Sequence, residues 1–153
     1  RRLPLALLVN ILGGPSANSR LNVSLREKNG LSYNIEASYT PYNDCGLAAI
    51  YFSSDHSNAD HCRELIDREL DALRRTKLTP RQLSMAKRQF LAQMAISMES
   101  NEGYMLGAGK SFLVHDDIDT MEDVYKKVAT VTADRIAEAA EEVFSDMSTL
   151  IYK

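Results

Sequence analysis

The residues with the clearest chemical potential gather around one glycine. In the stretch SRLNVSLREKNGLSYNIEASY, residues 19–39, Arg26 precedes Gly30 by four positions and Tyr33 follows it by three. A guanidinium fork and a phenol hydroxyl both donate hydrogen bonds, which suits a peptide carbonyl or a carboxylate. A corner with only a structural task has no need of this combination, so we treat it as a candidate binding site.

A structural interpretation of the same corner stays open. Tyr33 would then pack within a strand, and Arg26 would form an ion pair with Glu27 or with an upstream acidic residue, as surface residues commonly do. Arg20 in the same stretch is interpreted as structural, orienting the loop that follows Gly14.

The corner joins a charged helix to an alternating strand. The helix is predicted to be capped by Asn18 or Ser19 and to run to Asn29, with Gly30 in the left-handed position that ends many helices. Residues 33–41 alternate, which predicts a half-buried strand whose inner face carries Tyr33, Ile35, Ala37 and Tyr39. Arg26 lies about one helical turn before the glycine and Tyr33 opens the strand, so the corner can turn both side chains toward one spot.

Turn residues and apolar spacing outline the neighbouring elements. Residues 3–12 are predicted to form an apolar helix that is stopped by Gly13, Gly14 and Pro15. Residues 47–53 are apolar on both faces, which predicts a strand at the centre of its sheet. The short connection makes this strand an antiparallel hairpin partner of residues 33–41.

The second half of the chain is predicted to be mostly helical. Ser57 with Asp60 resembles a capping box that opens a helix to about Arg75, with an inner face made of Cys62, Ile66, Leu70 and Leu73. A further helix is expected from Thr79-Pro80-Gln82 to about Glu99, and another is expected to start at Asn101. Two shorter helices are expected after Thr120, which is paired with Asp123, and after Thr132, where Val131 and Ile136 form a hydrophobic staple. Residues 147–152 alternate and are predicted to form a closing strand.

This order of elements predicts an α+β fold in which helices pack on one face of an antiparallel sheet. Residues 1–153 have the size of a single domain. However, a sheet of three strands is too small to cover the apolar faces of so many amphipathic helices. The chain also opens with RRLPLALLVNIL, which already has a helical pattern. We therefore expect a truncated half-domain whose first strands lie upstream or come from a partner. An uncovered hydrophobic face could also drive homodimer formation.

Composition excludes several classes of function. The net charge is -3 and the isoelectric point is near 5.6, which argues against nucleic-acid binding. The longest apolar run, residues 3–9, is too short to span a membrane, and no signal peptide is visible. Two cysteines, Cys45 and Cys62, make no disulfide framework. The compartment stays open between cytoplasm and periplasm.

Three stretches resemble known binding motifs but lack the required spacing or residues. Residues 103–111, GYMLGAGKS, have five residues instead of four between the first glycine and the Gly-Lys-Ser of a phosphate-binding loop. The acidic run 115–119 lacks the glycine and distal glutamate of a calcium loop. His56 and His61 are five apart, where helical zinc pairs are four apart, and neither H-x-x-E-H nor H-E-x-x-H occurs. No metal ligand is therefore assigned to this chain.

The order of several short motifs resembles the C-terminal halves of the pitrilysin/insulysin family of zinc metallopeptidases, which includes mitochondrial processing peptidase and many bacterial zinc proteases. The resemblance runs along nearly the whole chain, through Leu12-Gly13-Gly14, Ser19-Arg20-Leu21, Leu25-Arg26-Glu27-Lys28, Gly30-Leu31, Tyr33, the run Leu78 to Leu83 with Ala86-Lys87, and Val131-Thr132 with Asp134-Arg135-Ile136.

The resemblance implies a function for the corner. Members of this family are built from two related α+β halves that close like a clam shell, and only the first half carries H-x-x-E-H and binds zinc. The second half contributes an arginine and a tyrosine seven residues apart, which matches Arg26 and Tyr33. This chain therefore resembles the non-zinc C-terminal domain, inactive alone, which binds a peptide substrate together with a zinc-binding N-terminal half or partner subunit.

A second function within the same family is also consistent with the motifs. The chain could belong to a non-catalytic scaffold or companion subunit, as the core proteins of a respiratory complex do. The intact Arg26 and Tyr33 pair favours the peptidase, because a scaffold has no need of it.

Overall fold

The computed structural model describes residues 2–152. Within this part of the chain, no helix is both long and apolar enough to cross a membrane. The elements follow one another in this order: α1 (Arg2–Gly13), the π-helix η1 (Asn22–Glu27), β1 (Asn34–Pro41), β2 (Gly46–Ser53), the 3-10 turn η2 (His56–Asn58), α2 (Ala59–Arg75), α3 (Pro80–Met98), α4 (Asn101–His115), α5 (Met121–Ala129) and α6 (Ala133–Phe144).

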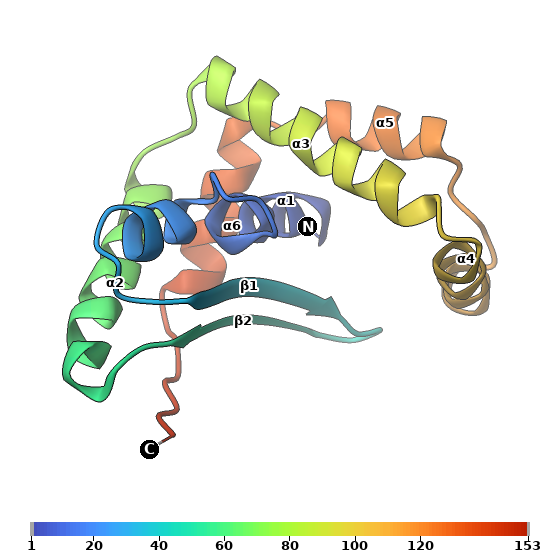
Figure 1. Cartoon of the computed structure of the whole chain (residues 1–153). Coiled ribbons are helices and arrows are strands. Elements are labelled where there is room, and N and C mark those ends of the chain that lie inside the picture. Colours follow the sequence, from blue (N-terminus) through green and yellow to red (C-terminus); the bar gives the residue numbers. More distant parts are fainter. Residues whose placement is uncertain (1, 153) are drawn as a thin grey trace.

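α1, α3, α5 and α6 lie on one side of a two-stranded sheet, and α2 runs past one end of it (Figure 1). β1 and β2 pair antiparallel, with Asn34 opposite Ser53 and Pro41 opposite Gly46. α1 packs on β1, α6 packs against both α1 and α2, and α3 crosses the side of α1 that faces away from the sheet. The predicted α+β fold, with helices on one face of an antiparallel sheet, is confirmed.

A single hydrophobic core joins these layers. Leu8 and Leu12 of α1 and Leu25 of η1 are completely shielded from solvent. The predicted inner face of α2 is buried in the same core and consists of Cys62, Ile66, Leu70 and Leu73. Because η1 contributes Leu25 to this core, the helix that carries Arg26 is fixed to the body of the domain.

Gly13 lets α1 approach β1 more closely than any other residue would allow. A Cβ atom on Gly13 would lie 2.7 Å from the backbone nitrogen of Ala37 and 2.8 Å from its Cβ. Backbone cannot rotate aside as a long side chain can, so the helix would have to shift. We expect Gly13→Ala to lower the free energy of unfolding by about 1–3 kcal/mol, measured by urea denaturation.

Gly107→Ala is the matched control for this prediction. Gly107 lies inside α4, and a Cβ atom there would meet no atom within 4 Å. Alanine favours a helix over glycine by about 0.8–1 kcal/mol, so this variant should be at least as stable as the parent protein. Equal stability of Gly13→Ala and the parent would contradict the close α1–β1 approach.

Most of the predicted helix caps are confirmed. Thr79 with Gln82 and Thr120 with Asp123 form complete capping boxes at the starts of α3 and α5. Thr132 accepts a hydrogen bond from the N–H of Arg135 at the start of α6. The hydrogen bond from the Thr120 hydroxyl lowers the pKa of the Asp123 carboxyl. These signals are readable because each one lies within four residues of sequence.

The predicted Ser57–Asp60 capping box is wrong. α2 begins at Ala59, its N-cap is Asn58, and no side chain caps it. Ser57 lies inside the 3-10 turn His56–Asn58, where the N–H of Asn58 bonds to the carbonyl of Asp55. The turn already organises the backbone before the helix, which leaves the serine hydroxyl away from the cap position.

Two predictions about strands are also wrong. Residues 147–152 are not a strand, and Leu150 and Tyr152 are exposed. β2 is not central, because the described sheet contains only β1 and β2, and Leu47 and Tyr51 of β2 point into solvent. A strand needs a neighbour for its backbone hydrogen bonds, and the tail leaves the helical layers without meeting one (Figure 1).

Candidate functional site

The helix before the corner is wound more widely than predicted. Helical winding begins at Arg20, and Asn22–Glu27 forms a π-helix in which the N–H of Lys28 bonds to the carbonyl of Val23 at 3.0 Å. Short π-helical segments are frequent at functional sites because they re-aim one side chain relative to an α-helix. Here the buried Leu25 anchors the segment, and the next residue, Arg26, is exposed.

Gly30 ends this helix in the predicted conformation. Its φ of +60° is left-handed, its N–H bonds to the carbonyl of Arg26 at 3.0 Å, and the N–H of Leu31 bonds back to the carbonyl of Leu25 at 2.9 Å. Glycine adopts this backbone conformation more readily than any other residue, because it has no Cβ atom. The turn between Arg26 and Tyr33 is therefore held by backbone hydrogen bonds at its start.

Ser32 holds the other side of the turn and was not singled out in the sequence. Its side chain is 3% exposed, and its hydroxyl lies 2.9 Å from the carbonyl of Asn34 and 2.8 Å from that of Ser53. The hydroxyl can donate to either carbonyl and so fastens the start of β1 to the end of β2. Ser32 and Ser53 are 21 positions apart in the sequence, so no local sequence pattern predicts this contact.

Tyr33 is 93% exposed, and the strand begins only at the next residue. The prediction that Tyr33 shares the inner face of the strand is therefore wrong, although Ile35 and Ala37 are buried there as expected. The structural alternative for Tyr33, packing within the strand, is excluded for the same reason. Its hydroxyl is free to contact another molecule.

Arg26 does form the ion pair with Glu27 that the structural alternative required, but the pair is weak. The Arg26 Nε lies 3.9 Å from the Glu27 Oε1, and both side chains are more than half exposed. Exposed pairs at this distance contribute little to stability. Within residues 2–152 the guanidinium has no other ion-pair partner, so it can reorient to an incoming carbonyl or carboxylate.

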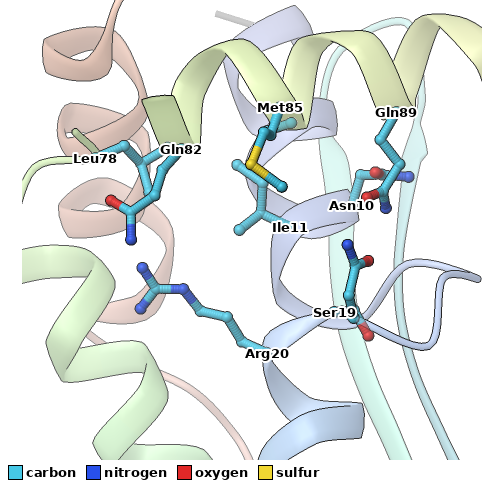
Figure 2. A pocket seen from close by; sticks show the side chains of 10 residues that line it. Asn10, Ile11, Ser19, Arg20, Leu78, Gln82, Met85 and Gln89 are labelled. Carbon is cyan, nitrogen blue, oxygen red and sulfur yellow. The ribbon is translucent and has the colours of Figure 1, made fainter. Parts of the chain in front are cut away.

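Arg20 lies two residues before η1 and serves the fold. Its guanidinium is 3.6 Å from the Glu69 carboxylate, and both side chains are largely covered, so the pair ties the start of the helix to α2. Figure 2 shows Arg20 pointing into a hollow of about 200 Å³ between α1 and the first turns of α3, toward Gln82. This hollow does not include Arg26 or Tyr33.

The candidate metal-ligating residues His56, His61 and Cys62 differ in burial. His56 and His61 are exposed, and the His61 Nδ1 faces the Glu64 carboxylate at 3.6 Å. Cys62 is buried, and burial raises the pKa of its thiol, which disfavours the thiolate that a metal or an electrophile needs. Among the residues that the structure describes, no group of three or more His, Cys, Asp or Glu side chains could hold a metal ion.

The family of this α+β domain is shown by its sequence similarity to known proteins. A family model described as "Peptidase M16 inactive domain" matches residues 1–90, and the chain belongs to this family. An uncharacterized zinc protease, YmxG, of Bacillus subtilis is 29% identical over 142 residues, covering 93% of this chain and 34% of that protein. An uncharacterized zinc protease of Streptomyces coelicolor is 28% identical over 150 residues, covering 98% of this chain and 32% of that protein.

A solved structure shares the fold. The crystal structure of a peptidase M16 inactive domain from Pseudomonas fluorescens matches 92% of this chain and 34% of its own chain, with a TM-score of 0.74 at 24% sequence identity. The chain thus spans about a third of the length of the curated relatives it matches.

Proposed function

We propose that residues 1–153 form the substrate-binding, non-zinc C-terminal domain of a zinc-dependent metalloendopeptidase that cleaves peptides or small proteins in a closed chamber. The observation that carries this proposal is the exposure of Arg26 and Tyr33 on either side of a turn that is fixed at both ends. Supporting observations are the family match and the names of the relatives, which are zinc proteases.

The two side chains would act as paired hydrogen-bond donors. In this proposal the Arg26 guanidinium and the Tyr33 hydroxyl bind carbonyl oxygens of the substrate backbone beside the bond that is cleaved. Donors fixed in advance stabilise the negative charge that develops on such an oxygen more than they stabilise the ground state. Buried Leu25 and Ser32 hold the backbone of both residues, so little reorganisation is needed when substrate arrives.

The zinc would be held by another part of the protein or by a partner subunit. When bound there, zinc supplies an activated water for peptide hydrolysis. In this proposal the present domain binds and orients the peptide and excludes water from the closed chamber. In this proposal it contributes no metal ligand.

An apolar surface marks where the rest of the protein would pack. α4 exposes Tyr104, Met105 and Leu106 within one helical turn. Exposed apolar residues that are grouped in this way commonly mark an interaction site. We propose that the zinc-binding half covers part of this surface.

A zinc-dependence assay tests the proposed function. The intact protein is expected to cleave a quenched fluorescent peptide, to lose this activity after dialysis against a chelator, and to regain it when zinc is restored. Residues 1–153 alone should show no cleavage under any of these conditions. An intact protein that binds zinc but cleaves no peptide in a diverse library would instead support the alternative, a non-catalytic scaffold or companion subunit.

A further inference from the structure

One face of α3 forms the wall of a groove that the proposed corner does not use. Residues 81, 84, 85, 88, 91 and 92 lie along one side of the helix, because their spacing follows the helical repeat. Together with Tyr125 of α5 they line an open groove of about 790 Å³. Figure 1 shows α3 and α5 side by side at the end of the molecule that lies away from the sheet.

The groove is positively charged in a protein whose net charge is -3. α3 carries three basic residues and no acidic residue. Arg81 and Arg88 both line the groove, and within residues 2–152 neither has an ion-pair partner. Positive charge without an internal partner attracts an anionic ligand.

The acidic residues in and just before α5 bond to groups of that same segment, and among the described residues none forms an ion pair with Arg81 or Arg88. The Glu122 carboxylate is 2.8 Å from the Lys126 Nζ, and Asp119 binds the Lys127 Nζ at 2.5 Å. Asp123 is held by the capping box with Thr120. None of the described residues that line the groove is acidic.

The remaining lining suits a peptide better than a bare anion. Ser84, Gln89 and Tyr125 offer hydroxyl and amide groups that can bond to a peptide backbone, and Met85 and Leu91 add apolar surface between them. A ligand with backbone amides, some apolar surface and negative charge matches all three features. An acidic peptide segment has this combination.

The spacing of the two arginines constrains the shape of that peptide. Arg88 follows Arg81 by seven positions, which corresponds to about 10.5 Å along the axis of α3. In a polyproline II segment, residues three apart lie on the same side and are separated by about 9.3 Å. In a β-strand, residues two apart share a side but are separated by only about 6.6 Å.

We propose that the groove between α3 and α5 binds an extended, acidic peptide segment whose carboxylates lie three residues apart, one opposite Arg81 and one opposite Arg88. This site is separate from Arg26 and Tyr33 and does not depend on peptidase activity. Binding can therefore be measured whether or not the intact protein cleaves peptides.

Fluorescence anisotropy with labelled proline-rich peptides tests the proposal on the intact protein. One peptide carries two glutamates three residues apart, a second carries them two apart, and a third carries glutamines in place of both. The first peptide should bind about tenfold or more tightly than the glutamine peptide, and measurably more tightly than the second. Equal affinity for the glutamate and glutamine peptides would overturn the proposal, and equal affinity for both spacings would overturn its geometry.

Matched variants separate the groove from a general charge effect. Arg81→Gln and Arg88→Gln are each expected to weaken binding of the first peptide about tenfold. Arg68→Gln and Arg135→Gln make the same charge change at exposed arginines outside the groove and should leave the affinity within about twofold. If the control variants weaken binding as much as the groove variants, the groove is not the binding site.

Discussion

Replacing Arg26 by alanine, or Tyr33 by phenylalanine, is expected to lower kcat/KM for peptide cleavage by the intact protein about 100- to 1000-fold for each variant. Each change removes a donor that would stabilise the developing negative charge on a substrate oxygen. The effect should fall mainly on kcat, because the proposed hydrogen bonds are stronger in the transition state than with bound substrate. Steady-state kinetics with a fluorogenic peptide measures both parameters.

These two variants should remain folded. Both side chains are exposed, so the free energy of unfolding should change by no more than about 0.5 kcal/mol. Tyr51→Phe and Arg68→Ala are suitable controls, since they remove the same groups from exposed positions outside the corner. Full activity in both Arg26→Ala and Tyr33→Phe would refute the proposed role, whereas lost activity in the control variants would indicate an indirect effect.

The second large effect concerns the residue that anchors the corner. Leu25 is completely buried in the core next to Arg26. Leu25→Ala removes its packing contacts and leaves a cavity, so it is expected to lower the free energy of unfolding by about 2–5 kcal/mol. That is a large part of the 5–15 kcal/mol that typically stabilises a domain. Urea denaturation followed by circular dichroism measures the change.

Leu113→Ala provides the contrast for this prediction. Leu113 is 86% exposed on α4, so the same truncation leaves no cavity, and alanine is a good helix former. Its effect on stability should be within about 0.5 kcal/mol. Similar effects of the two leucine variants would mean that η1 is not anchored in the core as described.

Features encoded by nearby residues could be predicted from the sequence. The hairpin, the left-handed Gly30 and the capping threonines Thr79, Thr120 and Thr132 all depend on residues within a few positions of one another. The buried face of α2 follows from helical periodicity alone. In each case the local chemistry and the tertiary structure favour the same conformation.

Features that depend on distant neighbours could not be predicted. The alternation of residues 33–41 extends to Tyr33, yet the strand starts one residue later, because Ser32 bonds across the hairpin to the carbonyl of Ser53. Residues 147–152 and β2 have the composition of strands inside a sheet. Composition indicates which side chains favour burial, but it does not identify the neighbouring strand or helix that would bury them. The π-helical winding of η1 left no recognisable pattern either.

In the candidate sites, too, some features could be predicted from the sequence and others could not. Arg26 and Tyr33 were identified through their types, their spacing and their resemblance to family motifs, and the structure finds both exposed beside a fixed turn. The basic groove on α3 was not predicted, because its charge is meaningful only once α5 is known to leave the arginines unpaired.

The most direct test is a crystal structure of the intact protein with an uncleavable peptide bound across its zinc site. The account predicts that the Arg26 guanidinium and the Tyr33 hydroxyl both lie within about 3.2 Å of carbonyl oxygens beside the bond that would be cleaved. A structure in which the two side chains point to opposite sides of the domain, or in which neither reaches the peptide, would contradict it.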